Sequence, residues 1–207
     1  MKKILTVSSL DKIFPNEKPQ ILQSKASVLK NQVFHYQVAC FSDVLFPYCH
    51  VEIISPIADF ITVRCVEPIA GHLATKKGRC DDYVLKKKKD GVLYPDLLRP
   101  LRDGKDILRE KTWTVFWVTV NHDEKELPVG EYEIEFVLSG AEDTFGEATF
   151  TLNVLDERLP PRSFDYTNWL HYDCIAQYHK LDVFSDEYYQ VLNEYIKTAV
   201  AHGMTML

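Results

Sequence analysis

The stretch that decides the fold class of this chain is EYEIEFVL, residues Glu131–Leu138. Its apolar side chains recur at every second position, with glutamate or valine between them: Tyr132, Ile134, Phe136 and Leu138. Successive side chains of a β-strand point to opposite faces of the sheet. This period of two therefore predicts a strand with one buried face and one exposed face.

The segment Glu147–Leu155 repeats the same alternation, with Ala148, Phe150, Leu152 and Val154 on the predicted inner face. The residues that separate the two stretches, Ser139–Gly146, are rich in turn formers. Two alternating runs joined by such a loop are typical of a β-hairpin.

Further strands are expected earlier in the chain. Val33–Phe41 and Lys111–Val120 are apolar on both faces, which favours central positions in a sheet. In Ile61–Cys65 apolar and polar residues alternate. Many strands, Gly/Pro/Asn/Asp turns and no long helical period before residue 158 predict a mainly β domain. We expect residues 1–158 to form an antiparallel β-sandwich, either immunoglobulin-like or jelly-roll-like.

The pattern changes at Pro160-Pro161, which is typical of a linker. Phe164–Leu170 is a strand candidate, and a helix is expected from an N-cap at Ser185 to a stop at Gly203. Met204–Leu207 resembles the start of another strand. Residues 159–207 are therefore predicted to be a linker and one β/α unit of a larger, incomplete domain. We expect the sequence to be the front part of a longer protein, or a shortened form of one.

Composition excludes several classes of protein. The chain has 207 residues, 46% of them hydrophobic, so it is not disordered by composition. Its 24 basic and 30 acidic residues give a net charge of -6, which argues against a nucleic-acid partner. No apolar run is long enough for a membrane helix, and no signal-peptide pattern is present, so a cytoplasmic location is expected. The sequence does not indicate an oligomeric state.

No cofactor or metal is expected. The five cysteines are irregularly spaced and contain no C-x-x-C pair. Cys40 and Cys65 occupy apolar positions of predicted strands and are interpreted as core residues. A Cys40–Cys49 or a Cys65–Cys80 disulfide remains an alternative.

One polar and aromatic cluster is the candidate binding site: Asn168, Trp169, His171, Tyr172 and Asp173. It follows the strand candidate Phe164–Leu170, and binding groups often lie in the loops where strands end. Trp169 would stack on the ring of a ligand, while His171 and Asp173 would hydrogen-bond its polar groups or each other. The alternative is structural: Trp169 lies in a core, and His171 pairs with Asp173.

Gly91–Leu98 reads GVLYPDLL, and Trp117–Val120 reads WVTV. Four further segments complete an ordered set of motifs: Leu127–Tyr132, Leu155–Pro160, Asn168–Asp173 and Ala201–Leu207. This set resembles a bacterial family of glycoside-hydrolase-like proteins related to glycoside hydrolase family 123. In that family the corresponding segments are a G-L-Y-P-D-P-L stretch, a strand and its turn, the exit from an N-terminal sandwich, and the first β/α unit of a barrel.

The resemblance implies a parent protein with a β-sandwich followed by a catalytic (β/α)8 barrel, so that residues 159–207 would be a linker and the first β/α unit of an incomplete barrel. The implied partner is a carbohydrate, whose ring would stack on Trp169 and whose hydroxyls would bond His171 and Asp173. The resemblance also implies that the substrate carries a terminal N-acetyl-galactosamine whose acetamido group acts as the nucleophile. An Asp-Glu pair would then orient that group and act as general acid. The pairs in this chain do not match that position: Asp123-Glu124, Asp156-Glu157 and Asp186-Glu187. No catalytic residue is therefore assigned.

Three functions follow from these patterns. The leading hypothesis is the accessory domain and barrel start of a glycosidase acting on N-acetyl-hexosamine-type or related glycans, inactive as this chain alone. The alternative is a non-enzymatic β-sandwich module that binds glycan or protein. In a third hypothesis, residues 1–158 only brace the barrel and bind no ligand.

Overall fold

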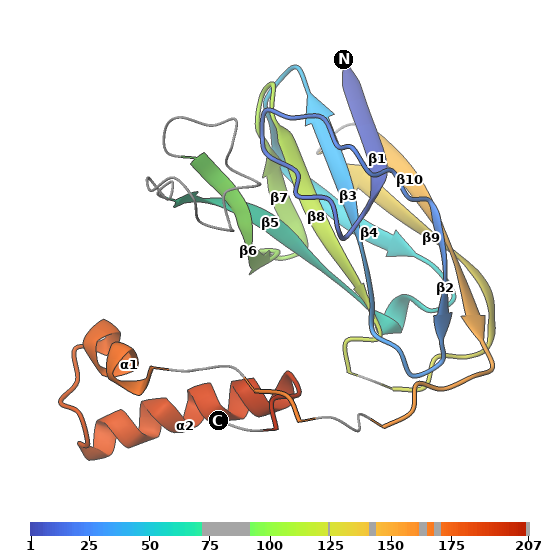
Figure 1. The fold of residues 1–207 in the computed structure, drawn as a ribbon. Coiled ribbons are helices and arrows are strands. Elements are labelled where there is room, and N and C mark those ends of the chain that lie inside the picture. Colours follow the sequence, from blue (N-terminus) through green and yellow to red (C-terminus); the bar gives the residue numbers. More distant parts are fainter. Residues whose placement is uncertain (72–91, 124, 141–143, 162–164, 168–170, 206–207) are drawn as a thin grey trace, which may run out of the picture. The chain divides into compact units, whose positions relative to one another are not determined.

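The structure is a computed structural model that describes residues 1–71, 92–123, 125–140, 144–161, 165–167 and 171–205. The chain forms two compact units, Met1–Leu159 and Pro160–Leu207 (Figure 1). The first unit contains ten strands and a 3-10 helix, η1 (Ala58–Phe60), and the second contains two helices, among the described residues.

One sheet of the first unit, sheet A, has five strands in the order β1-β3-β8-β5-β6. All four neighbouring pairs are antiparallel. The strands β3 and β8 lie inside the sheet, as their apolar sequences predict. The bounds of the strands are β1 (Lys2–Ser8), β3 (Phe34–Ser42), β8 (Trp113–Val120), β5 (Ile61–Gly71) and β6 (Val92–Pro100).

The other sheet, sheet B, has five strands in the order β2-β10-β9-β4-β7. Its first pair, β2–β10, is parallel and the other three are antiparallel. The prediction of purely antiparallel sheets is therefore wrong at this pair, which joins strands from opposite ends of the unit. The bounds are β2 (Lys25–Leu29), β10 (Thr144–Leu155), β9 (Gly130–Ser139), β4 (Phe46–Ile54) and β7 (Lys105–Leu108).

The inner faces of the two sheets share one hydrophobic core. Tyr36 of sheet A stacks on Phe150 of sheet B, with ring centroids 4.1 Å apart. Phe116 of sheet A likewise contacts Phe136 of sheet B at 5.3 Å. Burying each large apolar side chain of this kind contributes roughly 1.5–3 kcal/mol. The two sheets therefore form a sandwich, and aromatic rings from both sheets pack together in its core.

The hairpin predicted from Glu131–Leu138 and Glu147–Leu155 is confirmed. Strands β9 and β10 pair in antiparallel register, with Phe136 opposite Ala148 and Ile134 opposite Phe150. Ile134, Phe136 and Phe150 are fully buried, whereas Glu133 is exposed. The alternating pattern has placed its apolar face in the core.

The outer face of sheet A carries a second, smaller hydrophobic cluster. Ile13, from the segment between β1 and β2, is buried with Ala39 and Val115 on this face. The Gln37 amide holds the segment in place by donating to the carbonyls of Ser8 and Asp11, both at 2.8 Å. This segment therefore covers one part of the outer face of sheet A.

Strands β5 and β6 extend beyond the rest of sheet A. β5 pairs with β8 only as far as Val66, whereas its pairing with β6 continues to Gly71 (Figure 1). Arg99 on β6 donates to Glu67 on β5 at 2.6 Å and to Asp106 on β7 at 2.7 Å. Because β7 belongs to sheet B, these ion pairs join an edge of each sheet.

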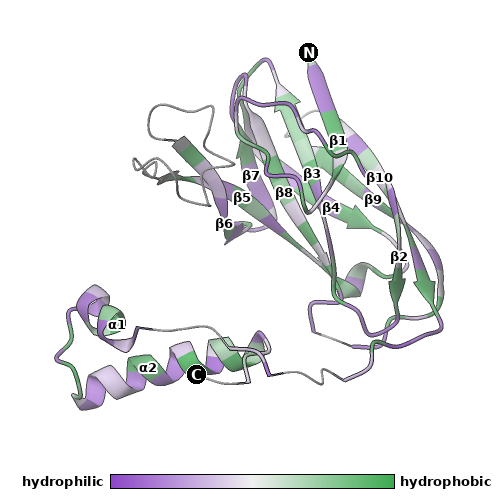
Figure 2. Ribbon diagram, in the orientation of Figure 1, coloured by the Kyte–Doolittle hydropathy of each residue, from purple (hydrophilic) through white to green (hydrophobic). Residues whose placement is uncertain are grey.

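The second unit contains helices α1 (Tyr172–His179) and α2 (Asp186–Ala201), both with mixed polar and apolar surfaces (Figure 2). The predicted α2 is confirmed: the Ser185 hydroxyl accepts a hydrogen bond from Tyr188 N at 3.1 Å. At its other end Gly203 has a φ of 88°, a left-handed conformation that suits glycine. Helix α1 was not predicted from the sequence.

The cysteine predictions are confirmed where the structure describes them. Cys40 and Cys65 are buried, and both are free thiols, as is Cys49. The Cys40–Cys49 disulfide is therefore not formed. Cys80 lies outside the described residues. Cys65 has a free thiol, which argues against the Cys65–Cys80 disulfide.

Candidate functional site

The predicted cluster lies around the beginning of α1. His171 is the N-cap residue of this helix, and Tyr172 and Asp173 form its first turn. Asn168 and Trp169 lie outside the described residues, as does most of the strand candidate Phe164–Leu170. The position of the whole cluster at a strand end therefore stays a prediction.

The described members of the cluster are available to a ligand. His171, Tyr172 and Asp173 are all exposed. His171 and Asp173 do not hydrogen-bond each other, and within the described part of the chain neither side chain has a hydrogen-bond or ion-pair partner. The carboxylate of Asp173 lies in the first turn of α1, where the helix dipole favours a negative charge. The predicted structural pair His171–Asp173 is thus absent.

Backbone contacts join the chain before α1 to the chain after α2. Thr205 N donates to Tyr166 O at 2.9 Å, and Tyr166 N donates to Thr205 Oγ1 at 2.7 Å. Tyr166 falls in the predicted barrel strand and Thr205 in the predicted start of the next one. Contact between segments on either side of a helical connection is what a β/α repeat requires.

A pair of aromatic residues in the same unit was missed in the sequence analysis. The ring nitrogen Nε2 of His179 lies 2.9 Å from the Tyr195 hydroxyl, so α1 and α2 are joined near the end of α1. Tyr178 adds an exposed ring in edge contact with His179. The pair was not predicted because α1 itself was not predicted.

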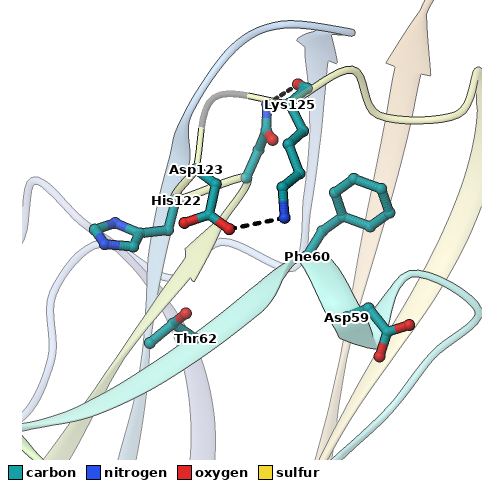
Figure 3. Close-up of a pocket in the computed structure, with 7 residues that line it drawn as sticks. Asp59, Phe60, Thr62, His122, Asp123 and Lys125 are labelled. Atoms are coloured by element: carbon teal, nitrogen blue, oxygen red, sulfur yellow. Dashed lines mark hydrogen bonds and ion pairs between the residues drawn. The ribbon is translucent and has the colours of Figure 1, made fainter.

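A small pocket lies in the first unit, between η1 and the loop that follows β8 (Figure 3). Asp123 and Lys125 form an ion pair of 2.9 Å at its rim. Asn121 donates to the carbonyl of Lys125 at 2.7 Å, and its own buried Oδ1 has no partner among the described residues. The volume of about 30 Å³ suits a water molecule and is too small for a sugar ring.

Two side chains determine which ring nitrogen of His35, on the outer face of sheet A, carries the proton. Trp117 Nε1 donates to His35 Nδ1 at 3.2 Å, and the Thr119 hydroxyl lies 3.2 Å from the same nitrogen. An indole nitrogen only donates, so Nδ1 must accept and the ring proton lies on Nε2. Burial lowers the pKa of His35, and the nearby charges of His122 and Arg64 lower it further.

No group of three or more His, Cys, Asp or Glu side chains suited to a metal ion occurs among the described residues. In the described part of the chain, neither helix has the length and apolar character needed to cross a bilayer.

Comparisons with known proteins give similarity at the level of structure. Neither a protein-family model nor a curated protein matches this sequence. A family 123 glycoside hydrolase from Clostridium perfringens, solved to study the hydrolysis of glycolipid glycans, matches 96% of this chain. The TM-score is 0.71 and the sequence identity is 12%.

This similarity establishes a fold like that of the family 123 enzyme, because identity is too low to carry more. Coverage of 96% requires residues of both units to take part in the match. The chain spans 36% of the length of that enzyme. The predicted resemblance to this family is thus confirmed for the fold.

Two other solved structures match less well. The major subunit of aggregative adherence fimbriae type I from Escherichia coli has a TM-score of 0.35 and 11% identity, covering 75% of this chain and 95% of its own. A protein that catalyses macrocyclization in alchivemycin A biosynthesis has a TM-score of 0.35 and 8% identity, covering 77% and 92%. Similarity at this level supports no functional conclusion.

Proposed function

We propose that this chain is the N-terminal sandwich and the first β/α unit of a glycoside-hydrolase-like protein. The observation that carries the proposal is the fold similarity to a family 123 glycoside hydrolase, which extends over 96% of the chain. The contacts between Tyr166 and Thr205 support the β/α unit, since they join the segments before α1 and after α2.

In this proposal the cluster of Asn168, Trp169, His171 and Asp173 contributes to the substrate site of the complete barrel. His171 and Asp173 are exposed and free of described partners, as binding groups should be. The Asp173 carboxylate would accept hydrogen bonds from sugar hydroxyls, and the His171 ring would donate one or accept one. The substrates are N-acetyl-hexosamine-type glycans.

Catalysis itself needs carboxylates that the described residues do not bring together. Asp123 is paired with Lys125, and Asp156 lies 2.9 Å from Lys30. Asp186 and Glu187 lie in the first turn of α2, where they stabilise the helix dipole. We therefore expect the 207-residue chain to hydrolyse no glycoside.

An activity assay and the gene sequence together test this proposal. Aryl N-acetyl-galactosaminides are incubated with the 207-residue chain, and turnover by this chain alone would contradict the assignment. The reading frame after codon 207 is then sequenced. An in-frame continuation that encodes an Asp-Glu pair is the expected result, and a stop codon there counts against it.

The site residues are tested in the continued protein. His171→Ala and Asp173→Ala are expected to raise KM, because each removes a hydrogen bond to bound substrate. His202→Ala is the matched control: His202 caps the end of α2 and bonds Thr198 O at 2.7 Å. Equal kinetics for His171→Ala, Asp173→Ala and wild type would remove both residues from the site.

A further inference from the structure

The outer face of sheet A presents a group of aromatic and basic side chains that the proposed function does not use. Trp117 on β8 faces Arg64 on β5, and His35 on β3 faces Thr119 on β8. Residues directly opposite in neighbouring strands have side chains about 5 Å apart on one face. We call Trp117, Arg64 and His35 the sheet A patch. All three side chains are half-buried.

The patch lies beside the part of the face that the chain itself covers. Gln37 is the neighbour of Trp117 on the other side, and its amide is already bonded to the segment that carries Ile13. Trp117 packs against the same cluster, and its ring also contacts that of His35, with centroids 5.4 Å apart. The Trp117 side chain is half-buried, so part of it remains accessible.

The two side chains whose electrostatic effect lowers the pKa of His35 are both basic, His122 and Arg64, although the whole chain has a net charge of -6. The Arg64 guanidinium makes no ion pair and no hydrogen bond within the described part of the chain. In the adjacent pocket the Asp123 carboxylate is engaged by Lys125, as Figure 3 shows. A half-buried guanidinium that has no carboxylate partner in the described part of the chain can bind an external carboxylate through two parallel hydrogen bonds.

The side chains next to Arg64 indicate which kind of anion would bind there. His35 is neutral, and its Nε2–H is a donor not used by Trp117 or Thr119. A partly open indole ring beside a neutral donor suits the apolar face and the hydroxyls of a pyranose. We propose that the sheet A patch binds an acidic sugar residue, with the sugar carboxylate on Arg64 and the ring of the sugar against Trp117.

The inference concerns the sandwich and does not depend on the barrel assignment. It is tested with the full 207-residue chain, in which the proposed function predicts no turnover, so the two proposals fail independently. The probe is digalacturonic acid, and its dimethyl ester is the matched neutral ligand. Binding is measured by titration calorimetry and by amide chemical shifts at low salt, where surface charge is least screened.

The expected result is binding of the acid with shifts centred on β3, β5 and β8, and binding of the ester at least about tenfold weaker. Arg64→Gln should weaken binding of the acid by a similar factor, whereas Arg102→Gln, an exposed arginine on the sandwich, should not. Trp117→Leu keeps an apolar side chain but removes the indole ring, so this variant should bind neither the acid nor the ester. Thermal melts verify that each variant is folded.

Three outcomes would overturn the proposal. Equal binding of the acid and the ester would remove the role of the carboxylate. Wild-type affinity in Arg64→Gln would remove the role of Arg64. Binding of poly-glutamate at the same residues, with an affinity equal to that of digalacturonic acid, would identify an acidic peptide rather than a sugar as the ligand class.

Discussion

At the scale of single residues, His35 couples the sandwich to pH. Its pKa in the folded chain is lowered from 6.5, first by burial and then by His122 and Arg64. A histidine with a lowered folded pKa stabilises the fold fully above its unfolded pKa and loses that contribution as pH falls through the folded value. Protonation also places a proton on Nδ1, which would break the bond from Trp117.

We therefore expect the wild type to lose stability between pH 7.5 and pH 5.5 more steeply than His35→Gln. The measurement is the thermal midpoint of both proteins across this range. Both proteins contain the same carboxylates, so the titration of those groups does not contribute to the difference between them. His202→Gln, a change in the other unit, is the control and should follow the wild type. Parallel curves for wild type and His35→Gln would show that His35 does not carry the dependence.

The thiols give a second residue-scale prediction. Burial raises the pKa of Cys65 to about 12 and also raises the pKa of Cys40 and Cys49, whereas Cys174 is exposed. Because only the thiolate reacts, Cys174 should react fast with a disulfide reagent and the other three slowly. In a Cys80→Ser background we expect one fast thiol per chain and none after Cys174→Ser. Several fast thiols would contradict the buried positions.

The sequence around His35 does not reveal that Trp117 is its partner. Trp117 lies 82 positions away, and only the register of β3 against β8 brings the two together. The sheet A patch could not be predicted for the same reason. Strand pairing is non-local, and neither residue carries a local signal of it.

At the scale of elements, the sequence was sufficient to predict a strand or helix where it contained a clear hydrophobic period or a capping residue. Strand β9 alternates with a period of two, and α2 begins at Ser185 and ends before Gly203, as predicted. Helix α1 was missed because it is eight residues long, lacks a side-chain N-cap bond and buries only Ile175 and Ala176. A pattern of two apolar positions does not define a helical period.

The cap of α2 is an element-scale prediction. Ser185→Ala removes the oxygen that accepts from Tyr188 N and should cost about 0.5–2 kcal/mol. The loss is measured as reduced helical circular dichroism and a lower thermal midpoint. Ser185→Asp restores an acceptor at the same position and should recover most of the loss. No difference between Ser185→Ala and wild type would mean that the cap contributes little.

At the scale of the whole molecule, the two units differ in the size of their hydrophobic cores. The first unit closes a core between two five-stranded sheets. Among the described residues of the second unit, the buried hydrophobic side chains are those of Ile175, Ala176 and Tyr188. Tyr178 and Phe184 are 79% and 73% exposed in that unit. Apolar surface of this extent needs further packing partners before it can stabilise a fold.

This contrast predicts that residues 1–159 fold without the rest of the chain, whereas residues 160–207 do not. The two described sheets lie inside the first unit, and its last residue is held by the hydrogen bond from Leu159 N to Asn31 Oδ1 at 2.8 Å. A small domain needs a sizeable apolar core to offset chain entropy, and the three buried hydrophobic side chains among the described residues of 160–207 do not provide one. Urea unfolding of the 1–159 fragment should show one cooperative transition with a midpoint close to the main transition of the full chain. An unfolded 1–159 fragment, or a cooperative transition in isolated 160–207, would contradict the division of the core.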